Sequence, residues 1–133
     1  MAADLATKYL DYLQAAIARM AGHCFSIKGW SITVTTAVLG LAAKEGAADL
    51  CLIGLLPVLL FWGLDSYFLV LERRFRKLFA AAAQSERTDR VSFDMSPGTV
   101  GAADIIAVMK RPALLAVHGP LTLALVGGWF LLR

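Results

Sequence analysis

The chain has few charged residues for its length. Only 17% of its 133 residues are Asp, Glu, Lys or Arg, against about 25% in soluble domains. Hydrophobic residues make up 59%, and the mean hydropathy is +0.67. A small soluble domain needs a surface of mixed charges, which this composition does not supply, and the same shortage of polar residues excludes a disordered chain. The composition predicts one integral membrane domain, with a soluble helical bundle as the alternative.

Cysteines and catalytic motifs are also scarce. The two cysteines, Cys24 and Cys51, exclude a disulfide scaffold, and the predicted spans place them at opposite faces of the membrane. The sequence has no Ser/Cys/His/Asp set at a known catalytic spacing and no His/Cys set at metal-ligand spacing. We therefore expect no enzymatic activity, no cofactor and no metal. The basic residues follow the predicted membrane face, so we expect no nucleic-acid binding.

Three apolar stretches predict membrane-spanning helices. The clearest runs from Pro112 to Leu132 without a charge, long enough to cross a hydrocarbon core of about 30 Å. The second, 50–71, is interrupted only by Asp65. The third, 29–43, is shorter, but a brief turn joins it to the second, which favours a helical hairpin. We predict an all-α fold with three transmembrane helices, a hairpin plus a C-terminal span, at 28–44, 49–71 and 112–132.

The rest of residues 1–133 belongs to the same single domain. Apolar residues at helical spacing over 3–22 predict an N-terminal amphipathic helix within a cytoplasmic segment, 1–27. The second helix is expected to continue beyond the membrane to about residue 84. Residues 85–111 are expected to form a loop and a short helix at 103–109, with a short strand at 91–95 as one option.

Basic residues are divided unequally between the two sides of the predicted spans. Eleven of the 13 lie in residues 1–28 and 72–111, and the other two are Lys44 and Arg133. Because cytoplasmic segments carry the excess of Lys and Arg, we expect the N-terminus in the cytoplasm and the C-terminus outside.

Asp65 is the main candidate for a functional side chain, since a carboxylate within a span points to function by default. If the hairpin turn centres between residues 46 and 47, Asp65 faces Lys28 across the pair. Such a pair would fix the register of the hairpin, with a permeation role as the alternative. Glu72 and Arg76 lie near the same helix face and could extend the pair into a polar seam that sets register or gating.

His118 is the second candidate, about two turns into the last span. A neutral imidazole bonded to a neighbouring helix is one interpretation, and a proton-sensing or pore-lining role is the other. Pro57 is expected to kink the second span. Trp30, Trp62 and Trp129 are expected to anchor the span ends at the interface. Small residues four apart permit close helix contact within one chain or between copies: Thr36 with Gly40, and Ala124 with Gly128.

Several runs resemble a widespread group of small, uncharacterised bacterial inner-membrane proteins over roughly residues 14–130. The most specific is Phe61-Trp62-Gly63-Leu64-Asp65-Ser66-Tyr67-Phe68-Leu69 followed by Glu72-Arg73, and the others are Lys28-Gly29-Trp30-Ser31, Ser92-Phe93-Asp94-Met95 and His118-Gly119. The broad plan, though not the motifs, is similar to that of SLATT-type proteins, whose membrane hairpins accompany nucleotide-signalled bacterial defence systems.

Two functions remain open at this point. The resemblance implies an oligomeric effector of bacterial, anti-phage defence that permeabilises or depolarises the inner membrane. The alternative is a non-conducting anchor or accessory subunit of a larger complex. The expected partners are the lipid bilayer, further copies of the chain, and a protein of the defence system.

Overall fold

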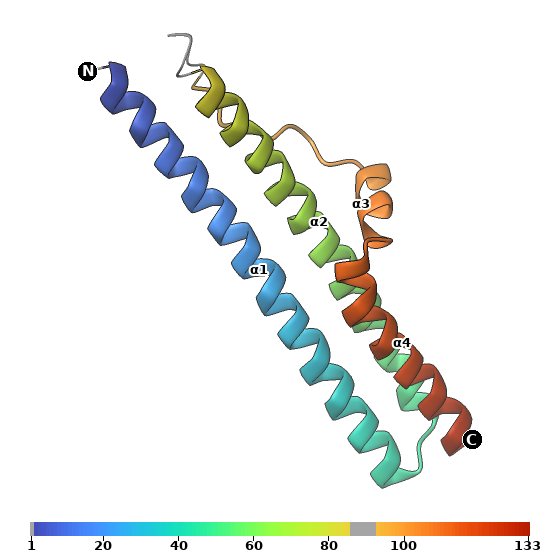
Figure 1. Cartoon of the computed structure of the whole chain (residues 1–133). Coiled ribbons are helices and arrows are strands. Elements are labelled where there is room, and N and C mark those ends of the chain that lie inside the picture. The colour runs from blue at the N-terminus through green and yellow to red at the C-terminus, as the bar shows by residue number, and fades with distance from the viewer. Residues whose placement is uncertain (1, 86–92) are drawn as a thin grey trace.

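The computed structural model describes residues 2–85 and 93–133, and over these residues every regular element is a helix. The all-α expectation is therefore confirmed for the described part of the chain. The four helices form a long rod with the two termini near opposite ends (Figure 1). Their bounds are α1 Ala2–Glu45, α2 Asp49–Ser85, α3 Ala102–Met109 and α4 Pro112–Leu132.

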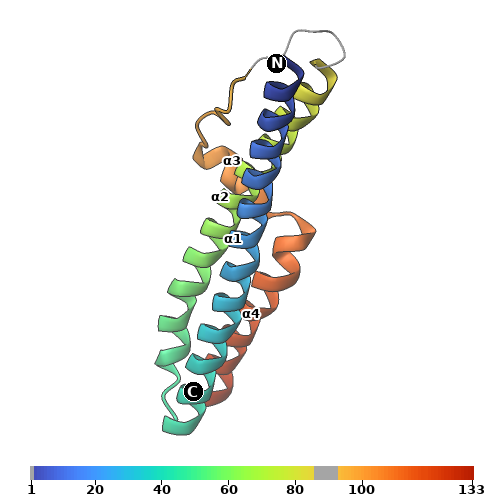
Figure 2. The same cartoon turned by 90° about the vertical axis from the view of Figure 1, so that its left-hand side faces the viewer.

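Helices α1 and α2 form an antiparallel hairpin that runs the length of the rod (Figures 1 and 2). α1 ends at Glu45, and the next residue, Gly46, has a φ of 62°, in the left-handed region that glycine adopts without strain. The Ala47 N–H then donates to the Ala42 carbonyl at 3.1 Å, which closes the helix end as in a Schellman motif. This compact turn fixes which residues of the two helices face each other.

The expected division of the first helix at residues 27 and 28 is not a break in the backbone. α1 is one helix of 44 residues, and it contains neither a proline nor a glycine with positive φ. The sequence changes there from amphipathic to apolar. This change concerns the surroundings of the side chains, and the backbone hydrogen bonds of the helix continue across it. Likewise, α2 continues through Pro57 from Asp49 to Ser85.

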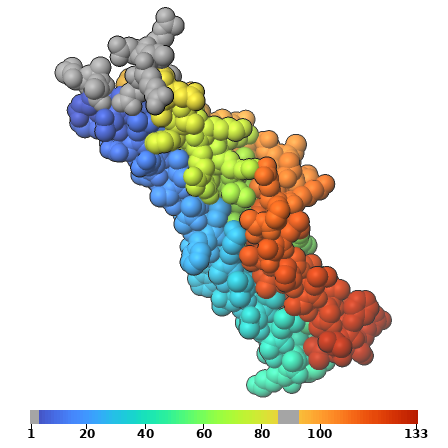
Figure 3. All heavy atoms as spheres, in the orientation of Figure 1, coloured from blue at the N-terminus to red at the C-terminus, as the bar shows by residue number. Residues whose placement is uncertain are grey.

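Helix α4 packs against the hairpin only along the half of the rod that holds the α1–α2 turn (Figure 3). We call this part, residues 28–65 with α4, the three-helix half. Its core is formed by four buried side chains, Ala42, Cys51, Val58 and Leu125. Both cysteines are free, as expected.

The surface of the three-helix half is strongly apolar. Side chains such as Ile53, Leu60 and Leu123 are 66%, 65% and 72% exposed, which in water would leave a large unfavourable apolar patch. Three helices, α1, α2 and α4, are long and apolar enough to cross a membrane. The length, composition and surface of these helices are compatible with a membrane protein.

In the other half, α1 and α2 continue as a pair, joined by α3 and the segment before it. We call this part, residues 2–27, 66–85 and 93–111, the two-helix half. Tyr9, Leu13 and Ala82 form its small core, and the Tyr9 hydroxyl donates to the Asp94 carbonyl. Burial and the Asp94 carboxylate raise the pKa of Tyr9, which keeps this donor protonated.

The segment before α3 has no strand over the described residues 93–101. The strand considered for 91–95 therefore does not form at 93–95, and residues 91 and 92 lie outside the described residues. Arg74 contacts this segment at several points: its guanidinium donates to the carbonyls of Pro97 and Thr99 and to Asp104 at 2.6–3.1 Å. The Asp104 carboxylate also accepts from the Gly101 N–H at the start of α3. Within 93–95, the Tyr9 hydroxyl occupies the Asp94 carbonyl, and the Arg74 bonds hold the residues that follow against α2.

Candidate functional site

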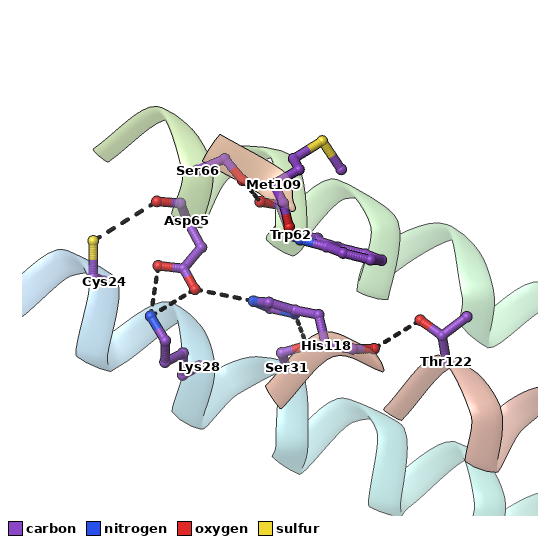
Figure 4. Close-up of polar contacts among 9 residues, drawn as sticks. All are labelled: Cys24, Lys28, Ser31, Trp62, Asp65, Ser66, Met109, His118 and Thr122. Atoms are coloured by element: carbon purple, nitrogen blue, oxygen red, sulfur yellow. Dashed lines mark hydrogen bonds and ion pairs between the residues drawn. The ribbon is translucent and has the colours of Figure 1, made fainter. Parts of the chain in front are cut away.

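The site is built around the Asp65 carboxylate, which is fully buried where α1, α2 and α4 meet (Figure 4). The Lys28 ammonium of α1 lies 2.8 Å from Oδ1 and 2.7 Å from Oδ2 of Asp65. These two residues face each other as the count of residues around the turn predicts. Lys28 keeps a quarter of its side chain exposed, whereas Asp65 has none.

His118 brings the third helix to the same carboxylate. Its Nε2 lies 3.0 Å from Oδ2 of Asp65, and its Nδ1 lies 3.5 Å from the Ser31 hydroxyl. Because a carboxylate only accepts, Nε2 carries the proton and donates. In the neutral ring Nδ1 is then an acceptor for the Ser31 hydroxyl. One carboxylate thus receives a donor from α1 and another from α4.

An indole ring covers the imidazole and extends the site to α3. The rings of Trp62 and His118 are stacked, with centroids 5.8 Å apart and planes 12° apart. The Trp62 Nε1–H donates to the Met109 carbonyl at the end of α3, at 3.2 Å (Figure 4). On the other side, the Cys24 thiol lies 3.7 Å from the Asp65 backbone carbonyl. Side chains of α1, α2 and α4 therefore form one network, to which α3 is joined through the Met109 carbonyl. We call it the Asp65 network: Cys24, Lys28, Ser31, Trp62, Asp65 and His118.

The Asp65 network lies between apolar layers and not at the end of the apolar helices. His118 follows Pro112 by six residues, about 9 Å along a helix axis. Val58 and Leu125 are fully buried on the side toward the α1–α2 turn, and Val70 and Leu114 are buried on the other side. Charges in such surroundings attract strongly when paired and are costly when separated.

Glu72 and Arg76 form a pair of their own on α2. The Arg76 guanidinium donates to Oε1 of Glu72 at 2.8–2.9 Å, one helical turn away. Within the described residues no hydrogen bond or ion pair joins these two side chains to Lys28 or Asp65. The polar seam expected from the sequence is thus two separate pairs, because the short i, i+4 contact satisfies both residues locally.

The small residues expected at helix contacts divide into two groups. Gly128 packs inside the chain: a Cβ built there would lie 2.9 Å from Leu39 and 3.2 Å from Cys51. Ala124 is exposed, and so are Thr36 and Gly40 on the outer face of α1. Contact within the chain is therefore seen at Gly128 only.

Sequence reasoning did not place Ser31, Cys24 or Trp62 in the site. Trp62 was expected at the membrane interface because it lies near a span end. Its ring instead covers His118, a contact between α2 and α4 that no spacing along the chain specifies. The one signal that the sequence offered for Ser31 was a hydroxyl side chain within an apolar stretch, and the structure shows that it is fully buried. Thr35, one turn further along α1, is also buried, and its hydroxyl has no hydrogen-bond partner among the described residues.

The arrangement has two chemical capacities. It holds three apolar helices together through a buried carboxylate with two nitrogen donors, and it places a group that can take up a second proton, the imidazole, next to that carboxylate. Comparison of the chain with protein-family models, with curated proteins and with solved structures gives no match.

Proposed function

We propose that the chain is a small protein of the bacterial inner membrane, with its N-terminus in the cytoplasm and its C-terminus outside. Several copies assemble and, when triggered in a defence response, permeabilise or depolarise the membrane. The Asp65 network acts as the lock of the resting state. The observation that carries this proposal is the fully buried Asp65 carboxylate, bonded to Lys28 of α1 and to His118 of α4.

The chemistry of the network suits a contact that can be released better than one that only adds stability. Well-packed apolar residues hold helices together at least as well as a buried ion pair does. An ion pair differs from an apolar contact in its response to water. Water stabilises the separated charges by hydration, whereas an apolar layer does not. A bundle held by Lys28, Asp65 and His118 is therefore stable while the site is dry. Once water enters the site, the free-energy cost of separating these three side chains becomes much smaller.

The outer face of α1 supports assembly of several copies. It carries a stripe of small residues at alternating spacings of four and three, the repeat that two packed helices use. All are exposed, and a Cβ built at any of the three glycines meets nothing within 4 Å. Close approach of a second helix needs such residues. The stripe consists of Gly22, Ser26, Gly29, Thr33, Thr36 and Gly40.

One feature favours the alternative, a non-conducting anchor or accessory subunit. The charged groups of the Asp65 network are directed at one another, so a single chain offers them no open aqueous path. A conducting path therefore needs several copies or a rearranged bundle. An anchor needs neither, and the same network would then only set the register of the three helices.

Membrane potential in bacteria during induction of the full chain separates the two functions. If the chain is an effector, its induction collapses the potential. The Asp65→Asn variant, which loses the negative charge of the Asp65 network, should collapse the potential at lower expression. Asp11→Asn is the matched control, because Asp11 is exposed and lies outside the network. An unchanged potential with all three chains, together with co-purification of a partner protein, would overturn the effector and support the anchor.

A further inference from the structure

Four basic side chains line one hollow at the joint between α2 and α4. It has a volume of about 340 Å³ and is lined by Arg73, Arg76, Lys77 and Arg111. The first three come from α2, and Arg111 is the N-cap residue of α4. The fold thus brings together cations that are distant in the sequence. We call this hollow the basic pocket.

Most of these cations have no partner of their own. Arg76 is paired with Glu72, but the side chains of Arg73, Lys77 and Arg111 make no hydrogen bond or ion pair with the described residues. The neighbouring Arg74 shows the contrast, because two carbonyls and the Asp104 carboxylate satisfy its guanidinium. Unpaired cations that line one hollow repel each other, so a bound anion would stabilise this part of the fold.

The basic pocket lies where the apolar span of α4 begins. Arg111 directly precedes Pro112 and is seven residues before His118, about 10 Å along the axis. On α2, Arg73 is eight residues from Asp65, about 12 Å in the same direction. The positive end of the α4 macrodipole adds to the potential at Arg111. If α4 spans the bilayer, the pocket lies at the level of the lipid headgroups.

We propose that the basic pocket binds a phosphate group, and that its source is the headgroup of an anionic phospholipid. Guanidinium groups bind phosphate oxygens in pairs of parallel hydrogen bonds, and basic pockets between helices at this level suit lipid headgroups. A phosphate there bridges α2 to the start of α4. The proposal requires that α4 spans a membrane but does not rest on the permeabilising role.

Lipid binding to the detergent-solubilised full chain tests the proposal by native mass spectrometry. The probes are phosphatidylglycerol and, for comparison, phosphatidylcholine. One variant, Lys77→Gln with Arg111→Gln, removes two cations from the pocket. Its matched control, Arg19→Gln with Lys44→Gln, removes two exposed cations elsewhere. A basic residue near an anionic surface contributes about a fivefold change in affinity, so we expect the pocket variant to bind phosphatidylglycerol about 25-fold more weakly and the control to bind normally.

Competition with inorganic phosphate identifies the source of the phosphate group. Phosphatidylglycerol binding that survives millimolar inorganic phosphate supports the lipid. Displacement by inorganic phosphate, lost in the pocket variant, would keep the phosphate site but overturn the lipid as its source. Equal loss in both double variants, or equal binding of phosphatidylcholine, would overturn the site. The single variant Arg111→Lys keeps the charge but loses the paired hydrogen bonds, so it should bind phosphatidylglycerol more tightly than Arg111→Gln, which separates loss of the site from misfolding.

Discussion

The two halves of the rod use the same pair of helices but are held together differently. In the three-helix half, the charged groups of the interior belong to the Asp65 network, and buried apolar clusters lie on either side of it along the rod. In the two-helix half, a small aromatic core is supplemented by Arg74 at the surface, which binds backbone carbonyls of the 93–101 segment. The three-helix half thus has a few polar contacts at its centre, and the two-helix half has several at its periphery.

This difference shows how burial changes the contribution of an ion pair to stability. An ion pair that is partly exposed, such as Arg74 with Asp104, can exchange its partner for water, so its contribution is modest. The Asp65 carboxylate has no exposed surface, so losing a partner leaves a charge in an apolar layer. We therefore expect changes in the three-helix half to be costly and global. Changes in the two-helix half should be small and local.

The largest effect is expected for Asp65→Leu. It leaves the Lys28 ammonium and the His118 N–H without their acceptor, and loss of one partner of a buried ion pair costs about 3–5 kcal/mol. The free energy of unfolding in mixed detergent, followed by circular dichroism, measures the loss. Lys28→Met combined with Asp65→Leu removes both charges and should recover most of the stability. A double variant as unstable as Asp65→Leu would show that the charges are not the cause.

A smaller effect is expected for Gly128→Ala. The added Cβ would lie within 3 Å of Leu39 and close to Cys51, and such overpacking costs about 1–3 kcal/mol. Gly40→Ala is the matched control, since Gly40 is exposed and its added Cβ meets nothing. We expect Gly40→Ala to leave the stability of the monomer unchanged and, if the stripe is a contact between copies, to weaken the oligomer. Equal destabilisation by both would contradict this packing of α4.

Arg74→Gln tests whether changes in the two-helix half are small and local. It removes the charged donor that holds the 93–101 segment and Asp104, so hydrogen exchange of the backbone around 94–104 should become faster. Hydrogen bonds with a charged donor contribute about 1.5–3 kcal/mol when protected, and less here because Asp104 is partly exposed. Exchange in α4 should not change. Faster exchange around His118 would show that the two halves are not independent.

The smallest effect, and the only gain, is expected for Thr35→Val. The Thr35 hydroxyl is buried without a partner, and valine has nearly the same shape without the polar group. Removing an unsatisfied buried hydroxyl should raise the free energy of unfolding by up to about 1 kcal/mol. Ser31→Ala, one turn away, should lower it slightly because Ser31 contacts His118. A loss of stability with Thr35→Val would reveal a partner for its hydroxyl.

The sequence was most informative where an interaction depends on counting residues along one chain. The turn at Gly46 and the helical rise place Lys28 opposite Asp65, and Pro112 with the apolar run gives the bounds of α4. The extension of α2 to about residue 84 follows from the lack of a breaker, and the structure ends that helix at Ser85. These features are local or depend on a single turn.

The contacts that could not be predicted depend on the rotation of one helix against another. Whether Trp62 faces lipid or His118 depends on where α4 packs, and the loop before α4 does not specify this. The spacing of Glu72 and Arg76 along α2 does not show that they bond to each other and not to Lys28 or Asp65. The unbroken course of α1 was missed because a change in amphipathicity was interpreted as a boundary between elements.

The Asp65 carboxylate couples α4 to the hairpin through His118. The most direct test is a double-mutant cycle of Asp65→Leu and His118→Leu, with the free energy of unfolding measured for all four chains in the same detergent. We expect the losses not to be additive, with a coupling of at least about 1 kcal/mol between the two sites. Additivity within about 0.5 kcal/mol would contradict it, because the two side chains would then stabilise the bundle independently.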